Sequence, residues 1–439
     1  MFFLIVFTII TFLILLFIVK SDSSHDFFSP QILLTLFSIF FYVLPAFPFL
    51  PGNDYFTKIC GIFFVGSSLT TIDRLNGITV SFMSYIFLLS GIYFSYLVSR
   101  KRISAEVSFK SEIIWNKINF FIVNLVYIIM GILEVLLLIR STGGILFIVT
   151  NLGKKFEQLS GNYIFTFGYM FLGIVAFLLI FQKKRITKLF ILLLITSILS
   201  AALLINRGLI VILLGSLILS FNYYIRPISF KKTLLIGAFG IFGAVSYKIL
   251  QLVTIYGTSS RYFSLQNLAS AMVHDLFGDV LIGPQQIAFA LKGIPSFLDF
   301  QYGKTITGFL MSFIPSSFFP GKPVVSGAGI FTQGLFPYLY SVGTTVPPGL
   351  ISELYMNFSF IGIIVGMFFF GVLMGSLYQS MKFRKSVFLI FLYSYSVTTF
   401  LYLLRGQFLL INRYIPFVLF FWLALRFSSK EKFIIERGK

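Results

Sequence analysis

Charged side chains are scarce in this chain, and their scarcity sets its class. Only 11% of the 439 residues are charged, whereas 58% are hydrophobic. A soluble globular domain carries about 25% charged residues. Apolar runs of about 18 residues or more recur along the whole chain, and they do not alternate as the strands of a membrane β-barrel do. The sequence therefore predicts an all-α, polytopic membrane protein.

Cysteine and histidine are almost absent. The single cysteine, Cys60, excludes an internal disulfide and a Cys-rich metal site. Two histidines without an H-E-x-x-H pattern do not make a His-rich zinc site. Asp275 and Asp279 lie four residues apart, but this spacing is common by chance. The chain also has no G-x-x-x-x-G-K-[ST] loop for a nucleotide and no G-x-S-x-G nucleophile turn. We therefore expect no metal and no other cofactor.

Acidic residues are also few, since 14 Asp and Glu stand against 34 Lys and Arg, for a net charge of +20. Such an excess can indicate nucleic-acid binding, but here the basic residues form short clusters between the apolar runs. That distribution is typical of the positive-inside rule for membrane proteins, so we expect no nucleic-acid partner. The clusters lie at residues 20, 100–102, 183–185, 226–232, 382–385 and 430–432.

The basic clusters predict the topology. If every cluster faces the cytoplasm, the spans between them must be even in number. About eleven spans, in a range of ten to fourteen, satisfy this condition, with the N-terminus outside and the C-terminus inside. The first run has no basic start and no cleavage site, so we expect a retained span and not a removed signal peptide. The predicted spans are 2–19, 31–50, 77–98, 118–139, 161–181, 189–205, 208–225, 233–255, 348–376, 386–404 and 408–426.

This topology predicts one polytopic domain over residues 1–439, with one large periplasmic loop at 257–347. The loop is too long for a plain connector. The charged tail "SSKEKFIIERGK" is expected to be a solvated end.

Two arginines lie at turns between predicted spans. Arg207 stands in "NRG" and Arg405 in "LLRGQ", next to residues that favour turns. The topology places both on the outer face, where the positive-inside bias disfavours them. Each arginine either extends to lipid headgroups or binds an anion. The second interpretation is chemically specific, because a guanidinium keeps its charge and contacts phosphate through two parallel hydrogen bonds.

The outer face also carries candidates for proton transfer. His274 could act as a general base, because histidine titrates near neutral pH, or it could be a structural loop residue. Glu353 lies at the entrance of a span, where an idle carboxylate is costly; it could be the base or hold one of the arginines in place. Asp275 and Asp279 are the next candidates for the base. The cations that could bind phosphate or pyrophosphate are Arg207, Arg261, Lys304, Lys322 and Arg405.

Five stretches of this sequence together resemble the O-antigen polymerase family, the Wzy-type oligosaccharide repeat-unit polymerases. The resemblance covers most of the chain loosely and is clearest over 200–410. Members often have a basic residue after "FIP", where Ser316 and Ser317 stand here. The stretches are "NRG" at 206–208, "YGKT" at 302–305, "FIPSSFFPGKP" at 313–323, "PPGLISELYMNFSFIGIIVGMFFFGVL" at 347–373 and "LLRGQ" at 403–407.

The resemblance implies a multi-pass protein of the bacterial inner membrane with a fold similar to the GT-C glycosyltransferases. Such a protein transfers a growing glycan from its undecaprenyl-pyrophosphate carrier to a lipid-linked acceptor repeat unit at the periplasmic face. The product is O-antigen or capsule polysaccharide, and no metal or other cofactor takes part. The implied partners are undecaprenyl-pyrophosphate-linked oligosaccharides, membrane lipids, a chain-length regulator and a flippase.

Two other functions fit parts of the same pattern. A flippase for lipid-linked oligosaccharides would line a cavity with charge and show two related halves. No half-repeat is visible, and Glu134 and Lys248 are among the few charges inside the predicted spans. An O-antigen ligase shares the outer loop and the arginines, but it transfers glycan to lipid A. Only the resemblance favours the polymerase over the ligase.

Overall fold

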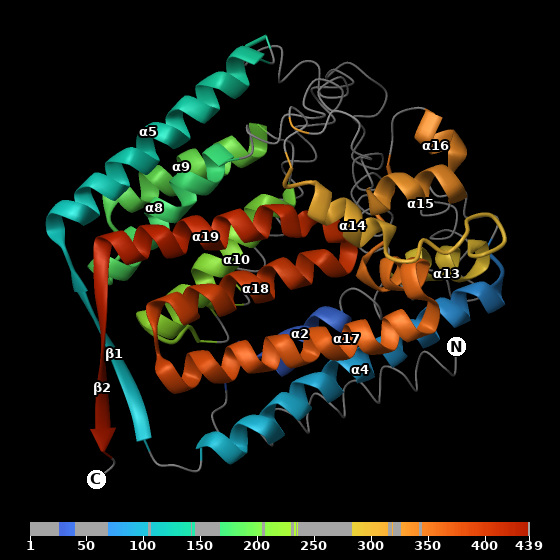
Figure 1. Cartoon of the computed structure of the whole chain (residues 1–439), viewed down its shortest axis with the longest axis horizontal. Coiled ribbons are helices and arrows are strands. Elements are labelled where there is room, and N and C mark those ends of the chain that lie inside the picture. The colour runs from blue at the N-terminus through green and yellow to red at the C-terminus, as the bar shows by residue number, and fades with distance from the viewer. Residues whose placement is uncertain are drawn as a thin grey trace. The chain divides into compact units, whose positions relative to one another are not determined.

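The computed structural model describes the chain as two compact units of helices, shown in Figure 1. Unit 1 comprises Met1–Ser104, Ala269–Gln379 and Thr399–Asn412, and unit 2 comprises Ala105–Leu268, Ser380–Thr398 and Arg413–Lys439. The residues that the structure describes are 26–39, 69–103, 107–141, 143–144, 167–203, 207–229, 232–233, 235, 283–314, 318, 326–341 and 345–437.

Among the described residues, five helices are long and apolar enough to cross a membrane. They are α4 (Thr71–Ile103), α5 (Lys117–Ser141), α17 (Leu350–Arg384), α18 (Val387–Arg405) and α19 (Ile411–Ser428), the last preceded by the 3₁₀ turn η7 (Phe408–Leu410). Three shorter apolar helices are α8 (Phe167–Lys183), α9 (Lys188–Leu203) and α10 (Arg207–Tyr224).

These helices support the predicted class, an all-α multi-pass membrane protein. They coincide closely with predicted spans, as for α5 against 118–139 and α18 against 386–404. The predicted span 2–19, and most of 31–50 and 233–255, lie outside the described residues. The number of about eleven spans therefore stays a prediction.

Unit 1 is built around the close approach of α4 and α17. A Cβ atom at Gly91 of α4 would overlap the carbonyl oxygen of Phe368, and one at Gly371 of α17 would overlap the carbonyl oxygen of Leu88. Small residues let the backbones of membrane helices approach closely in this way. The close approach improves van der Waals packing between the two helices and adds weak contacts between their backbones. Helix α2 (Pro30–Ser38) belongs to the same unit.

The predicted loop at 257–347 contains helices in its described part. They are α13 (Gly283–Gly293), α14 (Lys304–Met311), α15 (Gly327–Leu335) and α16 (Pro337–Ser341). All four belong to unit 1, and Figure 1 shows α13 beside the start of α17. Part of the predicted loop therefore consists of short helices, and α13 lies beside the first residues of α17.

Helix α17 is kinked near its start. Phe358 and Ser359 have non-helical backbone angles, and the φ of Ser359 is +58°. A positive φ is uncommon for a serine, so tertiary contacts must hold it. The kink separates a first segment, Leu350–Asn357, from the long apolar remainder. This first segment carries Glu353.

Unit 2 has an aromatic core. The phenylalanine rings at its centre stack and meet edge to face, as where Phe391 lies 3.7 Å from Phe421 and Phe177 lies 5.1 Å from Phe391 between ring centroids. Helix α8 is buried from Gly168 to Phe181. A helix that is apolar on every side, as this one is, belongs in the interior of a bundle.

Two strands correct the prediction that the charged tail is only a solvated end. Strand β1 (Val107–Trp115) pairs antiparallel with β2 (Ser429–Arg437), so that the chain end predicted to be solvated forms a ladder. The two strands lie side by side in Figure 1. Glu112 stands opposite Lys432 in the register. Cross-strand pairs of opposite charge stabilise a sheet, and the "FII" run in the tail has high strand propensity.

Candidate functional site

A turn between α18 and α19, at Arg405–Phe408, lies at the centre of a polar cluster in unit 1. Helix α18 ends at Arg405, and the next residues are held from two other elements. The Gly349 N–H donates to the Gly406 carbonyl at 2.9 Å. Gln286 Nε2 of α13 donates to the Arg405 carbonyl at 3.4 Å and to the carbonyl of Pro347. Gln286 of α13 and Gly349, the residue before α17, therefore fix the backbone of the turn.

The side chain of Gln407 fixes the turn to α15. Its Oε1 accepts hydrogen bonds from Ser326 Oγ and from the Ala328 N–H, both at 2.8 Å. Ser326 is the N-cap of α15, and its Oγ also accepts from the Gly329 N–H at 3.3 Å. The first N–H groups of a helix have no partner within the helix, so these contacts satisfy two of them.

Glu353 is fully buried, with 0% of its surface exposed, beside the same turn. Its Oε2 accepts from the Phe408 N–H at 2.7 Å. Its Oε1 has no hydrogen-bond partner within the described structure, and a Cβ at Gly327 would overlap this oxygen. A buried carboxylate with one unpartnered oxygen is costly, so the surrounding structure must hold it in place. The absence of a side chain at Gly327 provides the space for it.

Asn357, one helical turn after Glu353, joins α17 to α14. Its Oδ1 accepts from the Gly303 N–H at 3.0 Å, and its Nδ2 donates to Thr305 Oγ1 and to the Glu353 carbonyl, both at 2.8 Å. A buried asparagine with most of its polar atoms used stabilises one particular arrangement. We call the whole set the turn network; its residues are Gln286, Thr305, Ser326, Glu353, Asn357 and Arg405–Phe408.

The structure brings two of the predicted site residues together, because Glu353 and Arg405 belong to the turn network. Arg405 is half-buried and is the last residue of α18, where the helix dipole favours a positive charge. Lys304 begins α14 next to Thr305 and is exposed. Arg207 is the first residue of α10, in unit 2, and only its backbone is described. The candidates outside the described residues are Arg261, His274, Asp275, Asp279 and Lys322.

Most of the turn network was not predictable from the sequence. One signal was present, since Glu353 and Asn357 lie four residues apart in an otherwise apolar run and must share a helix face. Gln286, Ser326 and Gln407 had no such signal. Their roles depend on contacts between segments that are 61 to 119 residues apart in the chain.

Acidic, histidine and cysteine side chains do not gather into a possible metal site in the described part of the chain. No group of three or more of them lies close enough there to hold an ion. The prediction that the protein needs no metal remains open, because His274, Asp275 and Asp279 lie outside that part.

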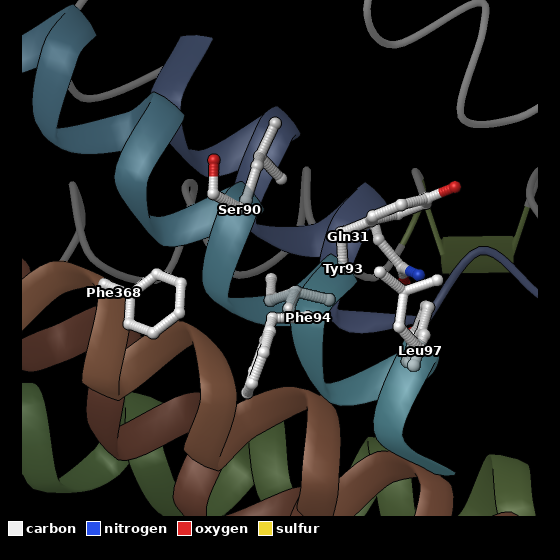
Figure 2. A pocket seen from close by; sticks show the side chains of 9 residues that line it. Gln31, Ser90, Tyr93, Phe94, Leu97 and Phe368 are labelled. Atoms are coloured by element: carbon white, nitrogen blue, oxygen red, sulfur yellow. The ribbon is translucent and has the colours of Figure 1, made fainter. Parts of the chain in front are cut away.

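An apolar groove of about 480 Å³ lies between α2, α4 and α17 in unit 1 (Figure 2). Tyr93, Phe94, Leu97 and Phe368 line it, and Gln31 is among its few polar residues. None of its lining residues is charged, and none belongs to the turn network. Such a groove suits hydrocarbon and not a phosphate group.

Comparisons with protein families, with curated proteins and with solved structures found no match to this chain. The case for a function therefore depends on the residues and on their geometry.

Proposed function

We propose that this chain is a membrane glycosyltransferase that polymerises lipid-linked oligosaccharide repeat units. One observation supports the proposal most. Three of the stretches that resemble the O-antigen polymerases, "YGKT", "PPGLISELYMN" and "LLRGQ", are far apart in sequence but meet in the turn network. If these residues only anchored separate spans in lipid, nothing would require them to share one buried set of hydrogen bonds.

In the proposed reaction, an acceptor sugar hydroxyl attacks the anomeric carbon of the donor glycan. The bond from that carbon to the pyrophosphate oxygen breaks, and undecaprenyl pyrophosphate leaves with the electron pair. Arg405 stabilises the negative charge that grows on the pyrophosphate, and Arg207, Arg261, Lys304 and Lys322 are further candidates for its contacts.

The hydroxyl proton needs an acceptor, and the proposal gives this role to His274, with Asp275 and Asp279 as the next candidates. Glu353 acts differently. Its carboxylate is fully buried and bound to the Phe408 N–H, three residues after Arg405. We therefore assign Glu353 as a positioning residue, which holds the turn that presents the arginine.

The proposal includes a bacterial inner-membrane location, about eleven spans, a fold similar to the GT-C glycosyltransferases and a site on the periplasmic face. The most direct test is the surface polysaccharide of a strain that lacks this chain. Glycan limited to a single repeat unit supports the polymerase. Complete absence of surface repeats indicates a flippase, and lipid-linked polymer that never reaches lipid A indicates a ligase.

Arg405→Lys is expected to reduce polymer at least about tenfold, nearly as much as Arg405→Ala. A lysine keeps the charge at the end of α18, but it cannot make the two parallel hydrogen bonds of a guanidinium to pyrophosphate. The measurement is polymer amount and length on a silver-stained gel, with membrane levels checked by immunoblot. Arg140→Lys is the matched control, because Arg140 also lies in the last turn of a span and is exposed. Wild-type polymer from Arg405→Lys would mean that Arg405 only anchors the helix.

Topology can be tested with single cysteines in a Cys60→Ser background. We expect Ser296→Cys, in an exposed turn after α13, to react with an impermeant maleimide added outside the inner membrane. Arg185→Cys, in the exposed turn between α8 and α9, should react only after the membrane is opened. The reverse labelling pattern would invert the topology and remove the site from the outer face.

A further inference from the structure

A second cavity lies in unit 2, and its lining is more polar than that of the apolar groove. Its volume is about 790 Å³, and it forms where α17 ends, α18 begins, α19 ends and the two strands start to pair. The lining residues that matter here are Arg384, Ser386, Trp422, Arg426, Lys430 and Glu431. None of these residues belongs to the turn network.

Three cationic side chains surround the cavity. Arg384 is the last residue of α17, Arg426 lies in the last turn of α19 and Lys430 follows in β2. All three are exposed. Arg384 and Lys430 belong to basic clusters that the positive-inside rule places on the cytoplasmic side. The cations therefore gather at the ends of two spans, on the side that the positive-inside rule assigns to the cytoplasm.

One carboxylate lies among these cations. Glu431 Oε2 accepts a hydrogen bond from the buried Ser386 Oγ at 3.0 Å, which fixes the carboxylate against the start of α18. Three cations against one carboxylate leave an excess of positive charge in the lining. The cavity is therefore complementary to an anion.

Part of the cavity wall is apolar. Trp422 lies four residues before Arg426, so both side chains share one face of α19. Trp422 is 42% exposed, and tryptophan is enriched where a membrane meets water. Leu425 and Phe388 continue the apolar lining. A free phosphate ion would gain nothing from this wall, whereas a lipid would place its acyl chain along it.

We propose that this cavity binds an anionic phospholipid of the inner leaflet. Arg384, Arg426 and Lys430 hold the headgroup phosphate, and the start of an acyl chain lies against Trp422. Basic pockets between membrane helices bind anionic headgroups by the same combination of charge and apolar contact. The inference does not depend on the proposed glycan chemistry.

Fluorescence of Trp422 provides a direct test. The chain has two tryptophans, so Trp115→Phe leaves Trp422 as the only one. Phenylalanine suits position 115, because the ring of Trp115 packs edge to face with the ring of Phe120, with 5.2 Å between the ring centroids, and a phenylalanine ring can keep this contact. The variant is reconstituted in phosphatidylcholine bilayers that contain acyl-brominated phosphatidylglycerol or acyl-brominated phosphatidylcholine. We expect the phosphatidylglycerol to quench at a mole fraction at least about fivefold lower, since one cation near anionic lipid contributes about that factor.

Two triple variants in the Trp115→Phe background locate the effect. Changing Arg384, Arg426 and Lys430 to glutamine should abolish the preference for phosphatidylglycerol. The matched control changes Lys183, Arg185 and Lys188 to glutamine, which removes three exposed cations elsewhere in unit 2 and should keep the preference. Equal quenching by both lipids before these changes, or equal loss in both triple variants, would overturn the proposal. If the first triple variant does not give a single gel-filtration peak, Lys430→Gln alone is measured, and an unchanged preference there counts against the site.

Discussion

Replacing Gly91 by leucine is expected to destroy the packing of α4 on α17, whereas Ser90→Leu should leave it intact. A Cβ at Gly91 would overlap the Phe368 carbonyl oxygen and would lie 2.9 Å from the Val372 nitrogen. Both atoms belong to the backbone of α17, so no side-chain rotation can relieve the overlap. The two helices would have to separate along the contact that small residues make possible.

The expected effect is large. Overpacking that side chains can absorb costs about 1–3 kcal/mol, and a leucine against backbone exceeds that range. We therefore expect the melting temperature in detergent to fall by more than about 5 °C. The measurement is loss of the monodisperse gel-filtration peak after heating.

Ser90 is the matched control for this change. It is the preceding residue on the same helix, it is exposed, and Figure 2 shows it among the residues that line the apolar groove. A leucine at this position enters the open groove, so it does not overlap the backbone of α17 as one at Gly91 would. Similar melting temperatures for Gly91→Leu and Ser90→Leu would show that the close contact of α4 with α17 does not exist.

The helices of this protein were predictable because lipid leaves the backbone few choices. Each span must satisfy its own N–H and C=O groups, so a long apolar run between basic residues becomes one helix of matching length. The boundary at Arg207 followed in the same way, since α10 begins at this residue. These features depend on local sequence alone.

The strands and the kink were not predictable, because they depend on distant contacts. The tail from Ser429 is mostly charged outside its "FII" run, and Trp115, the partner of Ser429, lies more than 300 residues earlier. The kink at Phe358–Ser359 has no proline, which is the usual sequence signal for a break.

The candidate site was predictable in its members but not in its connections. Glu353 and Arg405 were identified separately, from the cost of a carboxylate at a span entrance and from an arginine at an outer turn. What joins them is the hydrogen bond from the Phe408 N–H to Glu353 Oε2. A backbone N–H leaves no trace in a sequence, because every residue except proline has one.

That hydrogen bond leads to the second large effect. Glu353→Leu is expected to eliminate polymer, whereas Glu353→Gln should keep most of it. Leucine leaves the Phe408 N–H without an acceptor, and an unpaired buried N–H costs about 1–3 kcal/mol. The turn that carries Arg405 can avoid this cost by moving, and a displacement of about 1 Å can reduce a rate about a hundredfold. Glutamine has an amide oxygen at the same place, so it can still accept from Phe408.

The glutamine variant separates positioning from proton transfer. If Glu353 were the general base, glutamine would abolish the reaction as completely as leucine, with a loss of about 10²–10⁴-fold in rate. The assay is polymer formation at matched membrane levels, with the melting temperature measured for each variant. Gly327→Ala provides an independent control, because its methyl group would overlap Glu353 Oε1 and push the intact carboxylate away from Phe408. Loss of polymer in Gly327→Ala and Glu353→Leu, with polymer retained in Glu353→Gln, is the pattern that only a positioning role predicts.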